Sequence, residues 1–476
     1  MRKIAALITI VLFSQCSINE TTQKQLEKIH TIENHLDELN TQNSINGAVL
    51  IAINDTVIFE KAYGYANLNY KIPNTLNTKF NIASMGKMFT GVAIMQLVQK
   101  GLVSLDNSVG EFLPDYQNKV VRDSVTVHQL LTHTSGLRDF MTSEYYETSK
   151  DRYRSLSDYS NLFETQELAF KPGTEFSYCN SDYLVLGRII EKVSEMTFDE
   201  YLEKNIFQKL DMNNTGNYMN DHVIDSVATG YTHSIIYPDK VMSNIYISSV
   251  SGGPAGGGYS TIEDIFKFSK GVKNHILLNA KNTETLTSGK VDENTYAYGF
   301  TDIYSNQHRI IGHSGGHFGI ACELRIYQDI DYTVVLMTNR DAEDGFLDAR
   351  YFIQKVLTGS TPSIESYYST KQVIENILAK DGEKQSDIFT KDILREDMIN
   401  VEGYRQLSLG NYELAIKLFL LATIHFPESS NAFDSLGEAY MKVGDNSKAI
   451  ESYKKSLELD STNSNAKKNI KKLELD

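Results

Sequence analysis

The sequence predicts an α/β domain over residues 45–357, followed by an all-α repeat domain over residues 396–476. β-prone runs stand at both ends of the first region with amphipathic helices between them. This order favours one mixed sheet assembled from both ends, with a helical insertion. The second region repeats itself with a fixed period. At the start of the chain, an apolar run too short to span a bilayer follows two basic residues.

Composition and charge exclude some classes of function. The chain has 476 residues, of which 41% are hydrophobic and 22% charged, as in an ordinary globular protein rather than a disordered one. Its 46 basic and 61 acidic residues give a net charge of −15, which argues against a nucleic-acid partner. Three cysteines without CxxC spacing support neither a disulfide framework nor a zinc or redox site.

The N-terminus has the pattern of an export signal over residues 1–16. Arg2 and Lys3 precede the apolar run of residues 4–13, and Cys16 follows it. We therefore expect an exported, periplasmic or secreted protein. Two alternatives stay open: a lipoprotein signal in which Cys16 becomes the acylated first residue, or cleavage by an ordinary signal peptidase. In the first case a lipid anchor at Cys16 is the only membrane contact we expect.

Residues 17–44 are expected to form an N-terminal helix. Apolar residues recur there at spacings of three and four, at Leu26, Ile29, Ile32, Leu36 and Leu39. β-prone runs at residues 48–53 and 57–63 then predict a hairpin, because turn residues join them at Asn54-Asp55.

Capping residues and apolar runs predict the remaining elements of the first domain. Ser260-Thr261 is typical of a helix start, here for a helix over residues 262–268. Strands are expected at residues 319–327 and 332–338, and a closing helix at about residues 345–357. The run SGGPAGGGYS, residues 251–260, lacks both GxGxxG and a P-loop lysine. We interpret it as a flexible loop beside a cleft.

The second domain has the 34-residue period of tetratricopeptide repeats. The first unit has Gly403, Gly410, Ala415, Ile416, Phe419, Asn431 and Ala432, and the second has Gly437, Gly444, Ala449, Ile450, Tyr453, Asn465 and Ala466. Only two units are clear, so we expect the preceding segment or the first domain to cap them. Residues 358–395 are polar, partly helical and interpreted as a linker. Such repeats bind extended peptides, which suggests a protein partner; a stability or dimerisation module is the alternative.

Ser84 and Lys87 form the strongest chemical motif. They lie at i and i+3, on one face of a helix whose continuation is apolar. Burial favours the neutral form of a lysine, which can then take the proton of a serine hydroxyl. The same spacing at Ser452 and Ser464 lies on solvated faces of the repeats and is interpreted as structural.

Tyr178 and Asn180 follow a turn and precede a helix predicted over residues 183–193. A phenol near a cation can approach its anion and act as a general base. An asparagine there can hold a substrate amide. His128 and His133 have the spacing of a metal pair but no third ligand beside them, so we interpret them as loop and helix-end residues.

The third motif is Gly312-His313-Ser314-Gly315-Gly316-His317, at the entry to a predicted strand. Glycines there allow a ligand to approach the strand edge closely. A backbone N–H on this edge, together with that of Ser84, is a candidate oxyanion hole.

With these three motifs in this order, the chain resembles the penicillin-recognising serine hydrolases. The nearest branch holds class C β-lactamases, Streptomyces-type D-alanyl-D-alanine carboxypeptidases, esterases and D-aminopeptidases. Residues 101–106, 112–114 and 130–137 match the same pattern. The resemblance implies an α/β sandwich of the serine β-lactamase or penicillin-binding type. In that fold an antiparallel sheet is flanked by helices beside a helical subdomain, and the site lies in the cleft between them.

The resemblance also implies roles for individual residues. Ser84 would be the acylated nucleophile and Lys87 its activator, and Tyr178 would be the base that accepts the serine proton and returns it to the leaving group. Asn180 would bind the substrate amide. The substrate carboxylate would meet the strand edge at His313, Ser314 and Gly315, and the N–H groups of Ser84 and Gly316 would form the oxyanion hole. No metal or cofactor is expected.

The chain departs from the family at one important position. His313 stands where Lys-Thr-Gly would place a lysine, which shifts the expectation away from a dedicated β-lactamase. The activities left open are those of a carboxypeptidase, esterase, D-aminopeptidase or weak β-lactamase on a small-molecule or short-peptide substrate. A sensor that is acylated without turnover is a further alternative. Cys179 and Cys322 would pair only if their edges face each other, and we expect two buried free thiols.

Overall fold

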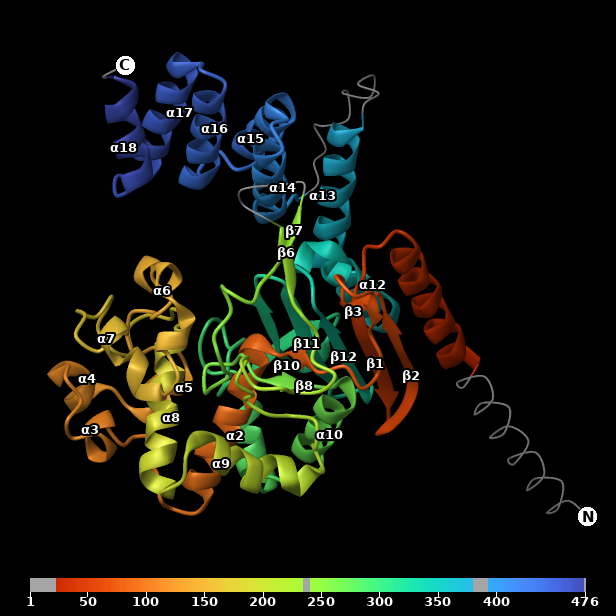
Figure 1. Cartoon of the computed structure of the whole chain (residues 1–476), viewed down its shortest axis with the longest axis vertical. Coiled ribbons are helices and arrows are strands. Elements are labelled where there is room, and N and C mark those ends of the chain that lie inside the picture. The colour runs from red at the N-terminus through yellow and green to blue at the C-terminus, as the bar shows by residue number, and fades with distance from the viewer. Residues whose placement is uncertain (1–22, 234–239, 380–392, 475–476) are drawn as a thin grey trace, which may run out of the picture. The chain divides into compact units, whose positions relative to one another are not determined.

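The computed structural model describes residues 23–233, 240–379 and 393–474, which are coloured in Figure 1. The predicted export signal and Cys16 lie outside these ranges. Contacts divide the chain into two compact units, residues 1–232 with 242–358 and residues 233–241 with 359–476. Within the described ranges, no helix has both the length and the apolar character needed to cross a membrane.

Six strands of the first unit form one sheet, in the order β2-β1-β12-β11-β10-β9. Their bounds are Gly47–Ile53 (β1), Thr56–Tyr63 (β2), Thr301–Ser305 (β9), His308–His317 (β10), Ile320–Tyr327 (β11) and Tyr332–Thr338 (β12). β1 pairs with β12 along its whole length, so both ends of the domain meet in the sheet, as predicted. All five neighbouring pairs are antiparallel. The expected mixed sheet is therefore wrong, because short turns join β1 to β2 and β9 through to β12, and a short turn reverses the strand direction.

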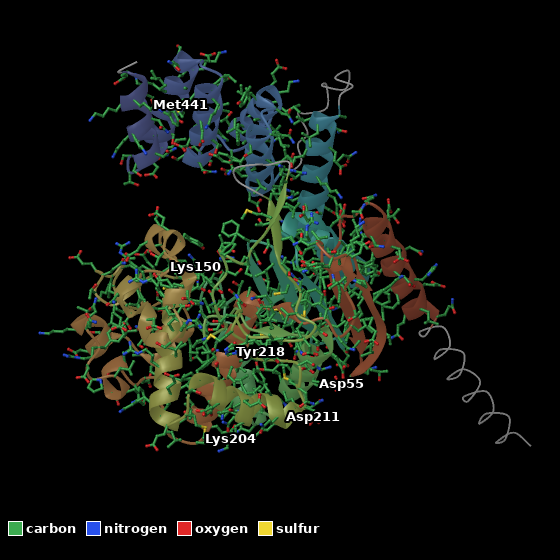
Figure 2. All side chains as sticks on the ribbon, in the orientation of Figure 1. Asp55, Lys150, Lys204, Asp211, Tyr218 and Met441 are labelled. Carbon is green, nitrogen blue, oxygen red and sulfur yellow. The ribbon has the colours of Figure 1, made fainter. Side chains whose placement is uncertain are left out.

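The hairpin between β1 and β2 lies where the sequence predicts it. Asn54 and Asp55 have φ angles of 48° and 62°, in the left-handed region that two-residue hairpin turns require. The Asp55 carboxylate, from a residue labelled in Figure 2, lies 3.1 Å from the ammonium group of Lys273.

Helices cover both faces of the sheet, because successive strand residues point to opposite sides. On β1, Leu50 packs into the core formed with α2 (Lys87–Gln99), α8 (Asn180–Ser194) and α10 (Ile262–Lys273). The next residue, Ile51, packs against the helix over residues 23–41 and α12 (Leu347–Thr358). Figure 1 shows α10 and the helix over residues 23–41 beside the strands, as the implied sandwich requires, whereas α8 lies in the neighbouring lobe.

Shorter helices form a lobe beside the sheet, orange to yellow in Figure 1. They are α3 (Val109–Phe112), α4 (Lys119–Ser124), α5 (Val127–Leu131), α6 (Ser143–Glu147), α7 (Ser160–Phe163) and α9 (Phe198–Leu202). α11 (Ala280–Thr287) follows α10, and short strand pairs are formed by β3 (Tyr65–Asn67) with β4 (Ile72–Pro73), β5 (Phe80–Asn81) with β8 (Tyr259–Ser260), and β6 (Tyr231–His233) with β7 (Val241–Ser243). The lobe formed by the short helices α3 to α7 and α9 is the implied helical subdomain.

The second unit consists of antiparallel helices. They are α13 (Pro362–Leu378), α14 (Glu396–Ser408), α15 (Tyr412–His425), α16 (Ser430–Lys442), α17 (Asn446–Leu459) and α18 (Ser464–Leu473). α14, α16 and α18 begin at the 34-residue period of tetratricopeptide repeats. A Cβ on Gly403 would lie 2.4 Å from the Phe419 ring, which explains why a glycine recurs at this helix crossing.

The segment interpreted as a linker contains α13, and this helix caps the repeats. Val373 and Ile374 of α13 pack into one apolar cluster with Ile399 of α14 and Leu418 of α15. Ala466 and Leu473 of α18 cover the other end, in a cluster with α17. The two complete helix pairs therefore have an apolar cover at each end.

Candidate active site

Ser84 lies on a tight turn at the start of α2. The 3₁₀ turn Ala83–Gly86 leads directly into α2, whose first residue is Lys87. Side chains at i and i+3 eclipse in such a turn, which brings Ser84 and Lys87 together. Ala83 has a φ of 39°, an uncommon conformation for a residue with a side chain. Its N–H donates to Asn81 Oδ1 at 2.9 Å and its carbonyl accepts from the Gly257 N–H at 3.0 Å, so neighbours on both sides hold the turn.

The Lys87 amine is fully buried beneath the serine. Its Nζ lies 3.2 Å from Ser84 Oγ, 2.7 Å from Asn180 Oδ1 and 2.7 Å from the carbonyl of Ala255. These three partners are neutral. Burial lowers the pKa of Lys87 to about 7, while Asp139 and other acidic groups act in the opposite direction. A large fraction of this amine is therefore unprotonated at neutral pH.

Tyr178 lies in the segment just before α8, as expected, and its ring faces the lysine. The Lys87 Nζ lies 4.8 Å from the ring centroid, and the Tyr178 hydroxyl is hydrogen bonded to Ser84. The residue is 39% exposed at the cleft. Burial around the hydroxyl raises the pKa of Tyr178, and the bond to Ser84 lowers it by less. The phenol is therefore neutral in the resting site, unlike the near-anion that the sequence suggested.

Asn180 has its hydrogen-bonding groups engaged inside the protein. Its Oδ1 accepts from Lys87, and its Nδ2 donates to Asp139 Oδ2 at 2.9 Å. The backbone N–H of Asn180 donates to the same carboxylate oxygen at 2.6 Å. Asn180 therefore orients Lys87, although it also lines the cleft.

The edge of β10 lies against the turn Ala83–Gly86, which carries Ser84. A Cβ on Gly315 would lie 2.4 Å from the Ile82 carbonyl oxygen and 3.0 Å from the Ser84 nitrogen, so only glycine fits there. Gly316 lines the cleft together with Ser84, which brings the two predicted oxyanion-hole residues to one place. Ser314 is exposed outside that lining.

His313 is buried behind the strand edge and does not line the cleft. It is 6% exposed, its Nε2 lies 3.3 Å from the Tyr296 hydroxyl, and its Nδ1 donates to the Ser314 carbonyl. Burial, and then the charge of Lys87, lower the pKa of His313 to about 4. The histidine is neutral at pH 7, so this placement does not present a cation to a substrate carboxylate.

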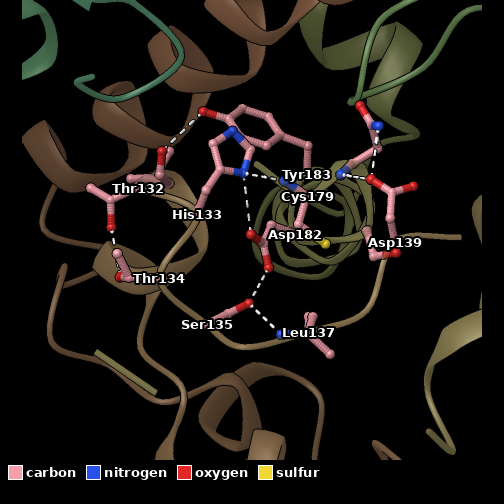
Figure 3. A network of polar contacts seen from close by, with 12 residues as sticks. Thr132, His133, Thr134, Ser135, Leu137, Asp139, Cys179, Asp182 and Tyr183 are labelled. Atoms are coloured by element: carbon pink, nitrogen blue, oxygen red, sulfur yellow. Dashed lines mark hydrogen bonds and ion pairs between the residues drawn. The ribbon is translucent and has the colours of Figure 1, made fainter. Parts of the chain in front are cut away.

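A buried network behind Tyr178 was not predicted from the sequence (Figure 3). His133 Nδ1 lies 3.2 Å from Asp182 Oδ2 and accepts from the Cys179 N–H at 3.1 Å, while its Nε2 lies 3.0 Å from the Tyr296 hydroxyl. Burial raises the pKa of Asp182 and lowers that of His133, so it disfavours the charged form of each. The two histidines considered as a metal pair take separate partners, because His128 Nδ1 lies 2.8 Å from the Tyr298 hydroxyl. Cys179 and Cys322 are both free and buried, as expected.

Hydrogen bonds hold the glycine-rich segment of residues 251–258 against α2 and the residues just before Ser84. Pro254 and Gly258 accept hydrogen bonds through their carbonyls from Thr90 Oγ1 and the Ile82 N–H, both at 2.8 Å. It lies beside the cleft, as expected, but these bonds contradict the expected flexible loop.

The cleft above Ser84 has a volume of about 210 Å³. Phe140, Met141 and Ile320 supply its apolar surface, and serine, asparagine, tyrosine and histidine side chains supply the polar groups. None of its lining residues, taken from the described parts of the chain, is Lys, Arg, Asp or Glu. The site therefore combines a partly neutral buried amine with an uncharged cleft.

Comparison with known proteins agrees with this geometry. Residues 32–358 match the family described as Beta-lactamase, and this match covers more than half of the chain. The chain belongs to the beta-lactamase family. Its members include serine hydrolases, and residues 430–463 match a tetratricopeptide repeat.

Individual relatives cover the first unit. Penicillin-binding protein 4* of Bacillus subtilis is 27% identical over 342 residues, which are 68% of this chain and 75% of that protein. Protein flp of Staphylococcus aureus is 28% identical over 335 residues, 68% of this chain but only 64% of that protein. The crystal structure of a penicillin-binding protein from Bacillus halodurans is 31% identical, with a TM-score of 0.61, over 66% of this chain and 98% of that one.

Proposed function

We propose that this serine hydrolase cleaves neutral esters or amides through an acyl-enzyme on Ser84. The observation that supports this most directly is the Lys87 amine, with a pKa near 7, 3.2 Å from Ser84 Oγ. An unprotonated amine at that distance is a general base for the hydroxyl.

In the first step, Ser84 Oγ attacks the substrate carbonyl carbon while Lys87 Nζ takes the hydroxyl proton. The carbonyl becomes an oxyanion, for which the N–H groups of Ser84 and Gly316 are the proposed donors. The Tyr178 hydroxyl gives its proton to the leaving oxygen or nitrogen as the bond to carbon breaks. The Lys87 ammonium then returns a proton to the phenolate.

Water completes the cycle. It attacks the acyl carbon and gives a proton to Lys87, and the Ser84 oxygen leaves with a proton from Tyr178. Lys87 then reprotonates Tyr178, which restores the resting site. In each half of the cycle Lys87 accepts a proton from the attacking hydroxyl and Tyr178 donates a proton to the leaving atom. Tyr178 has this role because burial keeps its phenol neutral.

The charge of the cleft supports the choice of a neutral substrate. A substrate carboxylate would lose its hydration without meeting a positively charged lining residue, because His313 is neutral and no described residue that lines the cleft is Lys or Arg. This favours esterase or amidase activity over carboxypeptidase activity.

A penicillin-acylated site is the second candidate, and the names of the relatives support it. Penicillins carry a carboxylate, so the same charge argument predicts slow acylation.

For the second unit, we propose that the repeats bind a protein partner. Export and a lipid anchor at Cys16 also remain proposals, which the mass of the mature N-terminus would test.

A matched pair of esters tests the proposal. The p-nitrophenyl esters of butyrate and of hemisuccinate have acyl groups of similar length, but only the second carries a carboxylate. We expect kcat/KM to be at least about tenfold higher for the butyrate, and Ser84→Ala to hydrolyse neither ester above background. Equal or faster hydrolysis of the hemisuccinate would contradict the proposed neutral substrate.

A further inference from the structure

Two buried polar atoms in the cleft have no hydrogen-bond partner within the described chain. They are Ser248 Oγ and His317 Nδ1, and both residues line the cleft that holds Ser84. Ser248 is 7% exposed. Buried polar atoms in folded proteins are almost always paired, so an unpaired set inside a binding cleft points to a missing ligand.

The surrounding structure holds the Ser248 backbone and the His317 ring in place. The Ser248 N–H donates to the Asn244 carbonyl at 2.9 Å, and Asn244 Nδ2 donates to the Phe318 carbonyl at 2.9 Å, which ties this segment to the turn after β10. The His317 ring lies 6.3 Å from the Tyr146 ring at an interplanar angle of 25°. These contacts fix the position of the Ser248 backbone and of the His317 ring.

The neighbouring Ser249 also lines the cleft, but its hydroxyl is hydrogen bonded within the protein. Its Oγ lies 2.9 Å from the Tyr145 hydroxyl of α6. Asn180, which the sequence suggested as the amide-binding residue, already bonds Lys87 and Asp139. A substrate amide or hydroxyl therefore needs another partner.

The chemistry of the two atoms defines their ligand. Burial, and then the charge of Lys150, lower the pKa of His317, so its imidazole is neutral. A neutral imidazole nitrogen and a serine hydroxyl together offer a donor and an acceptor, which match an amide or a hydroxyl group.

Position in the cleft indicates which part of the substrate reaches these atoms. His317 directly follows Gly316, a proposed oxyanion donor, whereas Tyr178 lies with His133 and Lys87. The leaving group must face Tyr178, so the acyl group extends toward His317 and Ser248. Beyond Ser248 a second cavity of about 210 Å³ shares Asn81, Ser248 and Ile320 with the cleft and leaves room for a longer acyl group.

We propose that Ser248 and His317 bind a neutral amide or hydroxyl group on the acyl part of the substrate. This inference rests on the proposed function, because it takes Ser84 as the acylated residue. It makes these two residues determinants of specificity rather than of the chemical step.

Boronic acids test the proposal without turnover, since they form a tetrahedral adduct with a nucleophilic serine. Acetamidomethylboronic acid and butylboronic acid have similar length, and only the first carries an amide. We expect the full chain to bind the acetamido compound about tenfold more tightly, the value of one hydrogen bond. Ser248→Ala and His317→Phe should each remove most of this preference, and the phenylalanine keeps the ring packing on Tyr146.

Ser249→Ala is the matched control, because its hydroxyl is already paired, and it should keep the wild-type preference. Unchanged preference in both Ser248→Ala and His317→Phe, with wild-type melting temperatures, would overturn the proposal, as would equal or undetectable binding of the two boronic acids. Hydrolysis of p-nitrophenyl butyrate, measured in parallel, reports separately on the proposed function. A preference found instead for an amide placed on the leaving group would also overturn the acyl-side assignment.

Discussion

The pH dependence of hydrolysis should move when Asp139 is replaced by asparagine. Asp139 accepts two hydrogen bonds from Asn180, which in turn accepts from Lys87, so one amide separates the carboxylate from the amine. Its charge is the largest influence that raises the Lys87 pKa against burial. The asparagine side chain has nearly the same size and retains one carbonyl oxygen, so the substitution removes the charge together with the hydrogen bonds to one of the two carboxylate oxygens, from Met141 or from Asn180.

The expected shift is downward by about one pKa unit, since charges beyond direct contact act less than the 1–3 units of adjacent pairs. The base must be unprotonated, so activity is lost as pH falls through the Lys87 pKa. At pH 6, a base with a pKa near 7 is roughly 9% unprotonated and one with a pKa near 6 roughly half. Relative to its own plateau, Asp139→Asn should therefore be about fivefold more active at pH 6 than the wild type.

The assay is kcat/KM for p-nitrophenyl butyrate from pH 5 to 9, read where the phenol and phenolate products absorb equally. Asp123→Asn is the control, because that carboxylate is exposed and paired with Arg122. The acidic limb should stay near pH 7 in the control and move down in Asp139→Asn. An unmoved limb in an active Asp139→Asn enzyme would refute Lys87 as the base.

Three further substitutions test other parts of the structure. Tyr178→Phe should lower kcat about 100-fold or more, since it removes the proposed proton donor to the leaving group; unchanged turnover would exclude that role. Gly315→Ala places a Cβ 2.4 Å from the Ile82 carbonyl, so steady-state kinetics should give a similar loss and calorimetry a lower melting temperature. Gly403→Ala overpacks the Phe419 ring and should destabilise the repeats by about 1–3 kcal/mol in urea, while ester hydrolysis stays at the wild-type level.

Local patterns predicted the elements well. The Asn54-Asp55 pair specified a tight hairpin because both residues tolerate left-handed φ angles, and β1 and β2 begin within one residue of the predicted positions. Thr261 caps α10 through the Asp264 N–H at 3.2 Å, as its position suggested. The helix is longer than expected, ending at Lys273 rather than residue 268, because its amphipathic pattern continues past the apolar run.

Long-range pairings were beyond the sequence. His133 and Asp182 lie 49 positions apart, and no local spacing predicts their contact. The partners of Asn180 depend on Asp139, which comes from a different segment. The lowered pKa of His313 depends on burial by the whole fold, which its residue type alone does not show.

The central claim is that Ser84 carries the acyl group, and intact mass spectrometry tests it most directly. Wild-type protein mixed with excess p-nitrophenyl butyrate and quenched in acid within the first turnovers should gain one butyryl group, located by digestion to the peptide containing Ser84. Ser84→Ala should gain none and should release no p-nitrophenol above background. Absence of the adduct in a wild-type protein that turns over, or undiminished hydrolysis by Ser84→Ala, would contradict the account.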